Sequence, residues 1–194
     1  MTPYVLKENT MSKVRVLTKK PIAFSGDTAK LERFFKLEHW TINVDGRIDD
    51  HVVWRRGHFV LPVVVTTNNL VVLVREAKKA AETVLYGLPA GALKKGEDPI
   101  TAALREVEEE TGYVAAMKNV NFVGEYYNNP DKSTEKHSVV LMQGAVRSGS
   151  QCLELGEDIL EVIAVPIEEA LKLVTIGMHR LALREVQHYL FSNF

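Results

Sequence analysis

Several glutamates gather around one arginine in residues 91–113, which read GALKKGEDPITAALREVEEETGY. Glu106 and Glu110 are about one helical turn apart, so in a helix their side chains lie almost in line on one face. Like charges at this spacing destabilise a helix by about 0.2–0.5 kcal/mol per pair, so we expect a compensating cation. Hard carboxylate oxygens suit Mg²⁺, which is usually bound by one or two carboxylates together with waters and substrate phosphates. The segment therefore predicts a divalent-metal site.

Neighbouring residues extend this acidic cluster. Glu109 falls on the same arc of the helix, and Arg105 can orient a nearby carboxylate such as Glu97 through a bidentate pair of hydrogen bonds. The loop before the helix contains glycines and brings backbone carbonyls, which are further oxygen ligands, close to the same end. The alternative interpretation is a solvated acidic helix face. We adopt that alternative for Glu108, which points away from the cluster.

Local signals predict the helix that carries the cluster. Asp98 can cap its N-terminus, and a proline follows at the first helical position, where a missing N–H costs nothing. Gly112 stands where a left-handed C-terminal cap is expected. We therefore expect a helix from about Pro99 to Thr111. Its apolar stripe, which should face a core, consists of Ile100, Leu104, Val107 and Thr111.

The rest of the chain is dominated by short runs rich in Val, Ile and aromatic residues, which are typical of strands. Two more helices are expected, one from about Pro166 and one over residues 179–190. Strands before, between and after a few helices indicate a mixed α/β layered fold. The first 45 or so residues form a β-rich extension. The expected strands cover residues 13–17, 33–42, 50–54, 59–67, 70–76, 120–127, 138–146 and 159–165.

Composition excludes several classes of protein. The length of 194 residues suits one domain plus an extension, and 46% hydrophobic with 25% charged residues is typical of globular proteins. A net charge of −1 argues against a general nucleic-acid binder and a polybasic membrane surface. The single cysteine, Cys152, excludes an internal disulfide, and we expect it to be buried or half-buried. With no apolar run of membrane-spanning length and no signal peptide, we expect a cytoplasmic protein with no nucleic-acid or membrane partner.

Taken whole, the acidic segment resembles the box of the Nudix hydrolases, G-x5-E-x7-R-E-U-x-E-E-x-G-U, where U is a bulky aliphatic residue. The last position is Tyr113, an aromatic residue, which leaves the charged positions untouched. Seven fixed charged or glycine positions coincide by chance on the order of once in 10⁸. The matching residues are Gly91, Glu97, Arg105, Glu106, Val107, Glu109, Glu110 and Gly112.

This resemblance implies an α/β/α sandwich around a mixed sheet, with the box as a loop–helix–loop. It also implies that the protein hydrolyses a nucleoside diphosphate linked to another moiety, with Mg²⁺ or Mn²⁺. The roles that it carries over are metal ligands for Glu106, Glu110 and the Ala90 carbonyl, an additional ligand or water-orienting group for Glu109, and a supporting pair for Glu97 and Arg105.

The segments before and after the box resemble the ADP-ribose pyrophosphatase and nucleotide-sugar branch of this family. That branch reads R-Q-[YF]-R and then E-L-P-A-G before the box. Arg75 matches the first arginine, Lys78 stands where the second is expected, and Gly87 replaces the glutamate. Downstream, a proline-bearing substrate loop is expected around Pro130, preceded by Tyr127. We therefore expect substrate contacts from Arg75, Lys78, Tyr127 and Pro130.

A further carboxylate is expected from the segment LELGEDILEV, which resembles the E-x-E-D-I-E-V segment of the branch. Glu157 is the candidate there, as a general base or a metal ligand; a simple loop carboxylate is the alternative. Residues 1–48 are consistent with the dimerising β-extension of the branch, which leaves residues 49–194 as the hydrolase domain and implies a homodimer.

The leading hypothesis is thus Mg²⁺-dependent hydrolysis of the diphosphate bond of ADP-ribose or a related nucleoside diphosphate sugar. The products would be a nucleoside monophosphate and a sugar phosphate. Two alternatives stay open: a house-cleaning pyrophosphatase of nucleoside triphosphates or dinucleotides, and a sensor that binds a nucleotide sugar without cleaving it.

Overall fold

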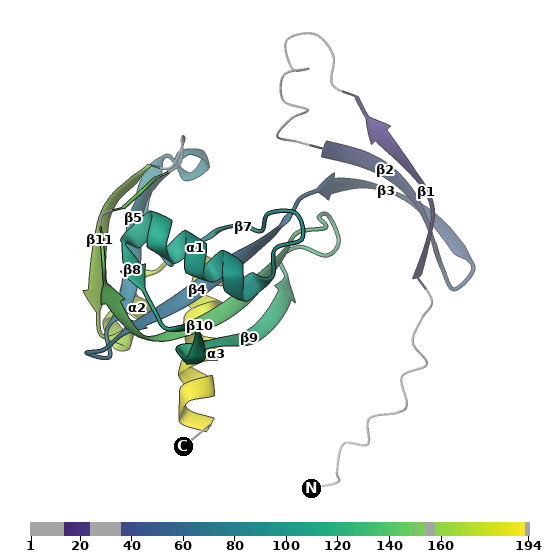
Figure 1. Cartoon of the computed structure of the whole chain (residues 1–194). Helices are drawn as coiled ribbons and strands as arrows, with labels where there is room; N and C mark the ends of the chain where they lie inside the picture. Colours follow the sequence, from purple (N-terminus) through teal and green to yellow (C-terminus); the bar gives the residue numbers. More distant parts are fainter. Residues whose placement is uncertain (1–13, 24–35, 150, 154–157, 193–194) are drawn as a thin grey trace, which may run out of the picture. The chain divides into compact units, whose positions relative to one another are not determined.

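The computed structural model describes residues 14–23, 36–149, 151–153 and 158–192 (Figure 1). Residue contacts divide the chain into two compact units. The smaller unit comprises Met1–Arg56 with Asn129–Thr134, and the larger comprises Gly57–Asn128 with Glu135–Phe194.

The smaller unit contains a three-stranded antiparallel sheet. The turn between its second and third strands is at Asp45 and Gly46, both with positive φ. The loop of residues 129–134 joins this unit, because the Trp54 N–H donates to the Lys132 carbonyl at 2.7 Å. The strands are β1 (Val14–Ile22), β2 (Lys36–Val44) and β3 (Arg47–Arg55).

The larger unit contains a mixed eight-stranded sheet in the order β11-β5-β4-β10-β8, with β6 on β5, β7 on β4 and β9 on β10. β4 and β10 are parallel, and the other pairs are antiparallel. Its strands are β4 (His58–Thr66), β5 (Val71–Lys78), β6 (Thr83–Gly87), β7 (Gly91–Ala92), β8 (Tyr113–Val114), β9 (Val120–Tyr127), β10 (Lys136–Arg147) and β11 (Ile159–Val165).

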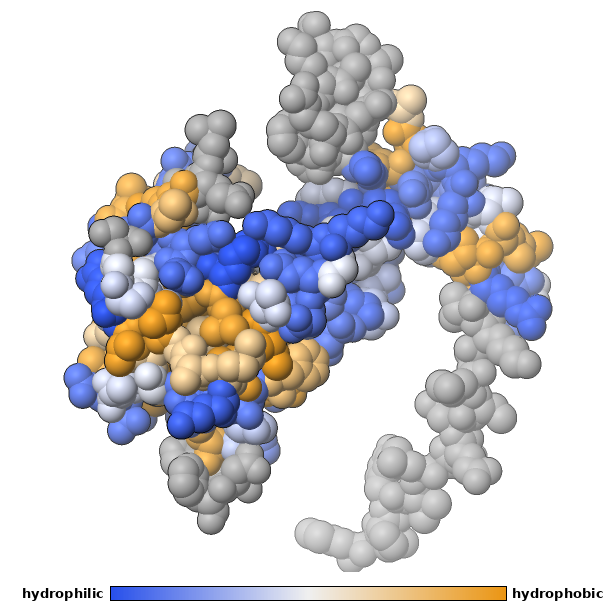
Figure 2. All heavy atoms as spheres, in the orientation of Figure 1, coloured by the Kyte–Doolittle hydropathy of each residue, from blue (hydrophilic) through white to orange (hydrophobic). Residues whose placement is uncertain are grey.

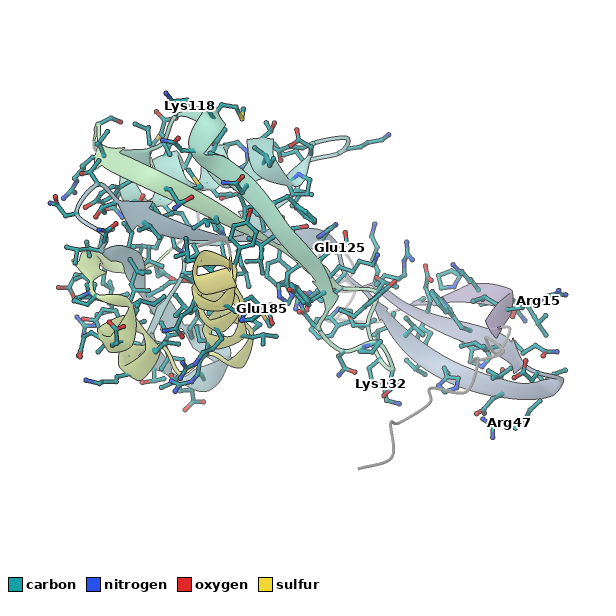
Figure 3. The ribbon with its side chains drawn as sticks, turned by 90° about the horizontal axis from the view of Figure 1, so that it is seen from below. Arg15, Arg47, Lys118, Glu125, Lys132 and Glu185 are labelled. Atoms are coloured by element: carbon teal, nitrogen blue, oxygen red, sulfur yellow. The ribbon has the colours of Figure 1, made fainter. Side chains whose placement is uncertain are left out.

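Helices cover both faces of this sheet. They are α1 (Pro99–Thr111), α2 (Ile167–Leu173) and α3 (Gly177–Ser192), and two 3₁₀ turns cover Lys79–Ala81 and Met117–Asn119. Because strand side chains alternate between the two faces of a sheet, β4 contributes side chains to two hydrophobic cores. Val60 and Val64 pack with α1, whereas Leu61 and Val63 pack with α2 and α3. The layers confirm the predicted α/β/α sandwich. Figure 3 shows α3, which carries Glu185, lying across its face of the sheet.

Strands β4 and β5 are joined by a hairpin at Asn68–Asn69 and meet at Val65 and Val71. Beyond this point each of the two strands has a different partner: β6 pairs with β5, and β7 pairs with β4. The Leu88–Ala90 connection therefore crosses from one branch of the sheet to the other, immediately before the segment that carries the acidic cluster.

Within the described part of the chain, no helix is both long and apolar enough to cross a membrane.

Candidate active site

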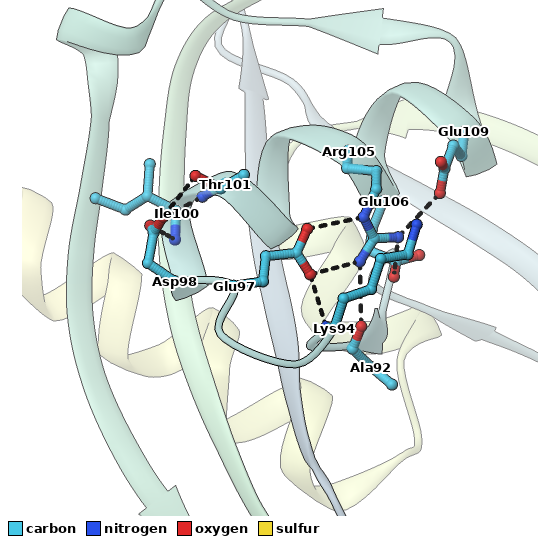
Figure 4. A network of polar contacts seen from close by, with 9 residues as sticks. All are labelled: Ala92, Lys94, Glu97, Asp98, Ile100, Thr101, Arg105, Glu106 and Glu109. Atoms are coloured by element: carbon cyan, nitrogen blue, oxygen red, sulfur yellow. Dashed lines mark hydrogen bonds and ion pairs between the residues drawn. The ribbon is translucent and has the colours of Figure 1, made fainter.

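Helix α1 begins and ends where its local signals predicted. The Asp98 carboxylate accepts hydrogen bonds from the backbone N–H groups of Ile100 and Thr101 at 3.0 and 3.1 Å (Figure 4). A hydrogen bond from the Thr101 hydroxyl, together with these two backbone bonds, holds the pKa of Asp98 below its usual range. Gly112 adopts a φ of 70°, and its N–H donates to the Glu108 carbonyl at 3.0 Å. Capping at both ends defines where the helix that carries the glutamates begins and ends.

Two carboxylates of α1 are buried: Glu106 and Glu110 are each 5% exposed. The Ala90 N–H donates to Glu110 Oε2 at 3.0 Å, which ties the helix to the loop before β7. Glu106 lies so close to Gly91 that a Cβ there would be 1.8 Å from its carboxyl carbon. The glycine at 91 is therefore required by close approach of the backbone to the Glu106 carboxylate.

Arg105 links the other carboxylates. Its Nε and Nη2 donate to the two oxygens of Glu97, both at 3.0 Å, in a bidentate pair (Figure 4). Nη1 donates to Glu106 Oε1 at 2.6 Å and to Glu109 Oε2 at 3.0 Å. Nη2 also reaches the Ala92 carbonyl at 3.1 Å, so the guanidinium connects helix and loop. Residues that the box spaces along the chain thus converge on one cation.

Hydrogen bonding sets the charge states in this network. The Arg105 guanidinium, assisted by the Lys94 N–H, lowers the pKa of Glu97 to about 2. Hydrogen bonds to Glu97, and then to Glu106 and Glu109, raise the pKa of Arg105 above its ordinary value. Both side chains are therefore charged throughout the range in which an enzyme would work. The viewer-facing side of α1 is correspondingly hydrophilic in Figure 2.

The buried carboxylates fit a divalent cation. Their oxygens are hard donors, and Mg²⁺ commonly takes only one or two carboxylates, with waters and substrate phosphates completing its shell. The cradle between Glu106 and Gly91 exists only because position 91 has no Cβ. Among the described residues, no group of three or more Asp, Glu, His or Cys side chains is already arranged to hold a metal ion. Glu109 is directed to Arg105.

The predicted substrate residues on β5 lie in a different environment. Arg75 is 43% exposed and faces Glu161 Oε2 at 3.7 Å, and the Tyr86 hydroxyl donates to the same oxygen at 3.1 Å. Lys78 is hydrogen-bonded to Glu76 on its own strand. Both cations remain partly accessible to solvent.

The predicted substrate-loop residues are both exposed. Tyr127 is 60% exposed at the end of β9, with Lys136 Nζ 4.6 Å from the centre of its ring. Pro130 belongs to the loop of residues 129–134 in the smaller unit.

Glu157, the candidate general base, lies outside the described residues. The segment shortly before it is tied to the end of α1: Gln151 Nε2 donates to the Glu110 carbonyl at 2.6 Å, and the Cys152 N–H donates to the Glu109 carbonyl at 2.8 Å. The sequence carries no signal for these contacts, because they join residues about 40 positions apart. Cys152 itself is exposed, so the expectation of a buried or half-buried cysteine was wrong. Its N–H is occupied in the backbone contact, while its side chain takes no part in the core.

A loop and a helix that bury two carboxylates beside a mixed sheet are suited to an enzyme that hydrolyses phosphoric anhydrides. A NUDIX domain profile matches residues 55–186, more than half of the chain, so the chain belongs to the Nudix family. Members of this family generally act with a divalent metal ion.

Known relatives agree with this assignment. The chain is 31% identical over 170 residues to an ADP-ribose pyrophosphatase of Bacillus subtilis (strain 168), covering 87% of this chain and 84% of that protein. It is 27% identical over 157 residues to a methanol dehydrogenase activator of Bacillus methanolicus, covering 78% and 84%. A solved ADP compounds hydrolase has the same fold, with a TM-score of 0.75 over 93% of this chain and 96% of that chain, at 20% identity.

Proposed function

We propose that the protein hydrolyses the diphosphate bond of ADP-ribose or a related nucleoside diphosphate sugar, with Mg²⁺ or Mn²⁺, and releases a nucleoside monophosphate and a sugar phosphate. The observation that carries this proposal is the pair of buried carboxylates, Glu106 and Glu110, held against the backbone of Ala90 and Gly91. The similarity to an ADP-ribose pyrophosphatase over 87% of the chain supports the substrate class.

Glu106, Glu110 and the Ala90 carbonyl would hold the metal ion, with Glu109 as a further ligand or a group that orients water. When bound, a divalent ion neutralises charge on the diphosphate and lowers the pKa of water. Arg105 and Glu97 act as a supporting pair: the bidentate contact and the bond to Ala92 keep loop and helix in register. This register matters because phosphoryl-transfer catalysis depends on positioning and electrostatics.

The remaining roles concern substrate and proton transfer. Arg75 and Lys78 are partly exposed cations that can pair with a diphosphate, and Tyr127 offers an exposed aromatic ring. Pro130 would shape the substrate loop. Glu157 would accept the proton of the attacking water.

The extension bears on assembly. We propose that residues 1–48 make a homodimer, which is supported by exposed apolar side chains on the sheet of the smaller unit. Within residues 1–48 these are Val16, Leu17 and Ile48. Sedimentation equilibrium of the wild type and of an Ile48→Asp variant would test this: the wild type should be dimeric, and the variant should shift toward monomer. A monomeric wild type would contradict it. The cytoplasmic location stays a prediction.

The substrate class can be tested with a panel of ADP-ribose, GDP-mannose and UDP-glucose in Mg²⁺. Alkaline phosphatase would be present, because it removes phosphate only from newly exposed monoesters. Phosphate release that requires the enzyme and stops with a chelator is expected from at least one nucleotide sugar. Nucleoside triphosphates need a separate assay of released pyrophosphate, since the phosphatase attacks them directly.

Three results of this panel would contradict the proposal. Turnover of triphosphates alone would indicate a house-cleaning pyrophosphatase. Chelator-sensitive binding of a nucleotide sugar without any product would indicate a sensor. Silence across the whole panel from folded, metal-replete protein would remove the nucleotide-sugar assignment.

A further inference from the structure

The Leu88–Ala90 connection, which carries the backbone of the proposed metal site, is fixed at both ends. At its far end the Ala90 N–H donates to Glu110 Oε2 at 3.0 Å. At its near end the Leu88 N–H donates to His179 Nδ1 at 2.9 Å. His179 belongs to α3, so a helix on the opposite face of the sheet from α1 holds the start of this connection.

His179 is well placed for a fixed role. Its side chain is buried, with the residue 6% exposed, and its helix is anchored by the fully buried Ala182, Leu183 and Val186. An imidazole that accepts a hydrogen bond at Nδ1 carries its proton on Nε2. Burial, reinforced by the positive charge of Lys78 and by His137, lowers the pKa of His179 to about 3. The ring is therefore neutral near pH 7, and Nδ1 keeps the lone pair that Leu88 needs.

Gly87 is complementary to this imidazole. A Cβ at position 87 would lie 2.9 Å from His179 Nδ1 and 3.3 Å from Ile176 Cδ1. Any side chain there would displace the ring from the Leu88 N–H. Glycine at position 87 therefore leaves the space that the imidazole from α3 occupies.

We propose that His179 is a positioning residue of the active site: by holding the Leu88 N–H it sets the path of the connection that presents Ala90 and Gly91 to Glu110 and Glu106. Each link is direct, because Ala90 bonds to one carboxylate and Gly91 leaves room for the other. Groups that orient metal ligands without touching the metal typically contribute 10- to 100-fold to metal affinity or activity. The proposal rests on the proposed function in assigning a metal ion to these carboxylates.

Two substitutions of His179 separate positioning from packing. His179→Asn keeps an acceptor close to the place of Nδ1, whereas His179→Leu fills similar volume without one. His188→Leu, at an exposed position of the same helix, controls for general effects on α3. Mn²⁺ binding to the protein without substrate, measured from the electron paramagnetic resonance signal of free Mn²⁺, reports on the site without requiring turnover.

We expect His179→Leu to weaken Mn²⁺ binding about 10- to 100-fold. His179→Asn should recover most of that loss, and His188→Leu should bind as the wild type does. The Leu88 amide should exchange with solvent faster in His179→Leu than in His179→Asn. Unchanged Mn²⁺ affinity in His179→Leu would overturn the proposal. So would equal losses in the Leu and Asn variants, which would indicate packing alone.

A second pair of variants keeps the test open if His179→Leu does not fold. Gly87→Ala retains the imidazole but pushes it from the Leu88 N–H, and it should also weaken Mn²⁺ binding. Gly57→Ala is the matched control, because a Cβ at position 57 meets no atom within 4 Å. Equal Mn²⁺ affinity in the two glycine variants would overturn the proposal.

Failure of the proposed function gives a different pattern. Wild-type protein would then bind Mn²⁺, lose it on Glu110→Gln, and release no product from any nucleotide sugar. The effect of His179 on Mn²⁺ binding would still be measurable in that case. Mn²⁺ binding that is insensitive to Glu110→Gln would overturn the positioning role itself.

Discussion

Two arginines of the larger unit show how differently one side chain can be used. Arg105 is 18% exposed and donates to three carboxylates and a carbonyl. Arg75 is 43% exposed and faces one carboxylate at 3.7 Å. The Arg105 guanidinium is hydrogen-bonded to other residues of the chain, so its charge stabilises the fold of the site. The Arg75 guanidinium keeps much of its hydration, so an incoming anion can compete with Glu161 for it.

This difference has an energetic side. Removing one partner from a buried, hydrogen-bonded ion pair leaves an uncompensated charge and costs about 3–5 kcal/mol, whereas exposed pairs contribute about 0–1 kcal/mol. The Arg105 network should therefore respond sharply to substitution in both stability and activity. The Arg75 pair should respond weakly in stability and, in our proposal, through substrate affinity.

The largest expected effect comes from the carboxylates that Arg105 helps to place. Glu110→Gln should reduce kcat by at least about 100-fold, because it removes the charge of a proposed metal ligand, and loss of outer-shell groups alone typically costs about 10- to 100-fold. Glu108, which is exposed on the same helix, gives the control, because Glu108→Gln should keep wild-type kcat. Steady-state kinetics together with thermal unfolding would check both. Equal activity of the two variants would contradict the assignment.

The next largest loss of activity is expected from a substitution of Gly91. Gly91→Ala places a methyl group inside the space of the Glu106 carboxylate and should lower activity about 10- to 100-fold by displacing it. Gly57→Ala, where the added Cβ meets no neighbour within 4 Å, should be indistinguishable from wild type. Wild-type kinetics for Gly91→Ala would show that the position of Glu106 does not matter.

Replacing each arginine by lysine tests the comparison itself. Lysine cannot reproduce bidentate contacts, so Arg105→Lys should lose about 1–3 kcal/mol of unfolding free energy and most of its activity. Arg75→Lys should change the unfolding free energy by no more than about 0.5 kcal/mol, with its kinetic effect confined to KM. Urea unfolding and kinetics on both variants would measure this. Similar losses for both would remove the distinction between the two arginines.

The ion pair of Glu97 with Arg105 should also make the stability depend on pH. Because the folded pKa of Glu97 is about 2, below its usual 4.5, its ionised form stabilises the protein fully above pH 4.5, and this contribution is lost as the pH falls toward 2. Glu97→Gln should therefore be less stable than wild type at pH 6, by a gap that closes on acidification. A gap that is constant between pH 6 and pH 3 would contradict the ion pair.

Much of this architecture was predictable because its signals are local. Asp98 and Gly112 bound α1 within a few residues of the side chains they cap, and the fixed spacing of the box brings Glu97 to Arg105. The predicted strands at residues 120–127 and 159–165 were confirmed with the same bounds. The short strands β6, β7 and β8 were missed, since two to five residues carry too little pattern.

What the sequence could not supply are the long-range partners. His179 meets Leu88 across 91 positions and Gln151 meets Glu110 across 41. Such contacts depend on which elements stack across the sheet, and neither residue belongs to a motif. The only sequence signal was the glycine at 87, whose meaning is clear once the imidazole beside it is known.

The most direct test of the account is phosphorus NMR of ADP-ribose incubated with Mg²⁺ and either wild type or Glu110→Gln. We predict that wild type converts the diphosphate resonances into those of AMP and ribose 5-phosphate, and that Glu110→Gln leaves the substrate intact. Persistent diphosphate resonances with folded wild type, or equal conversion by the variant, would contradict it.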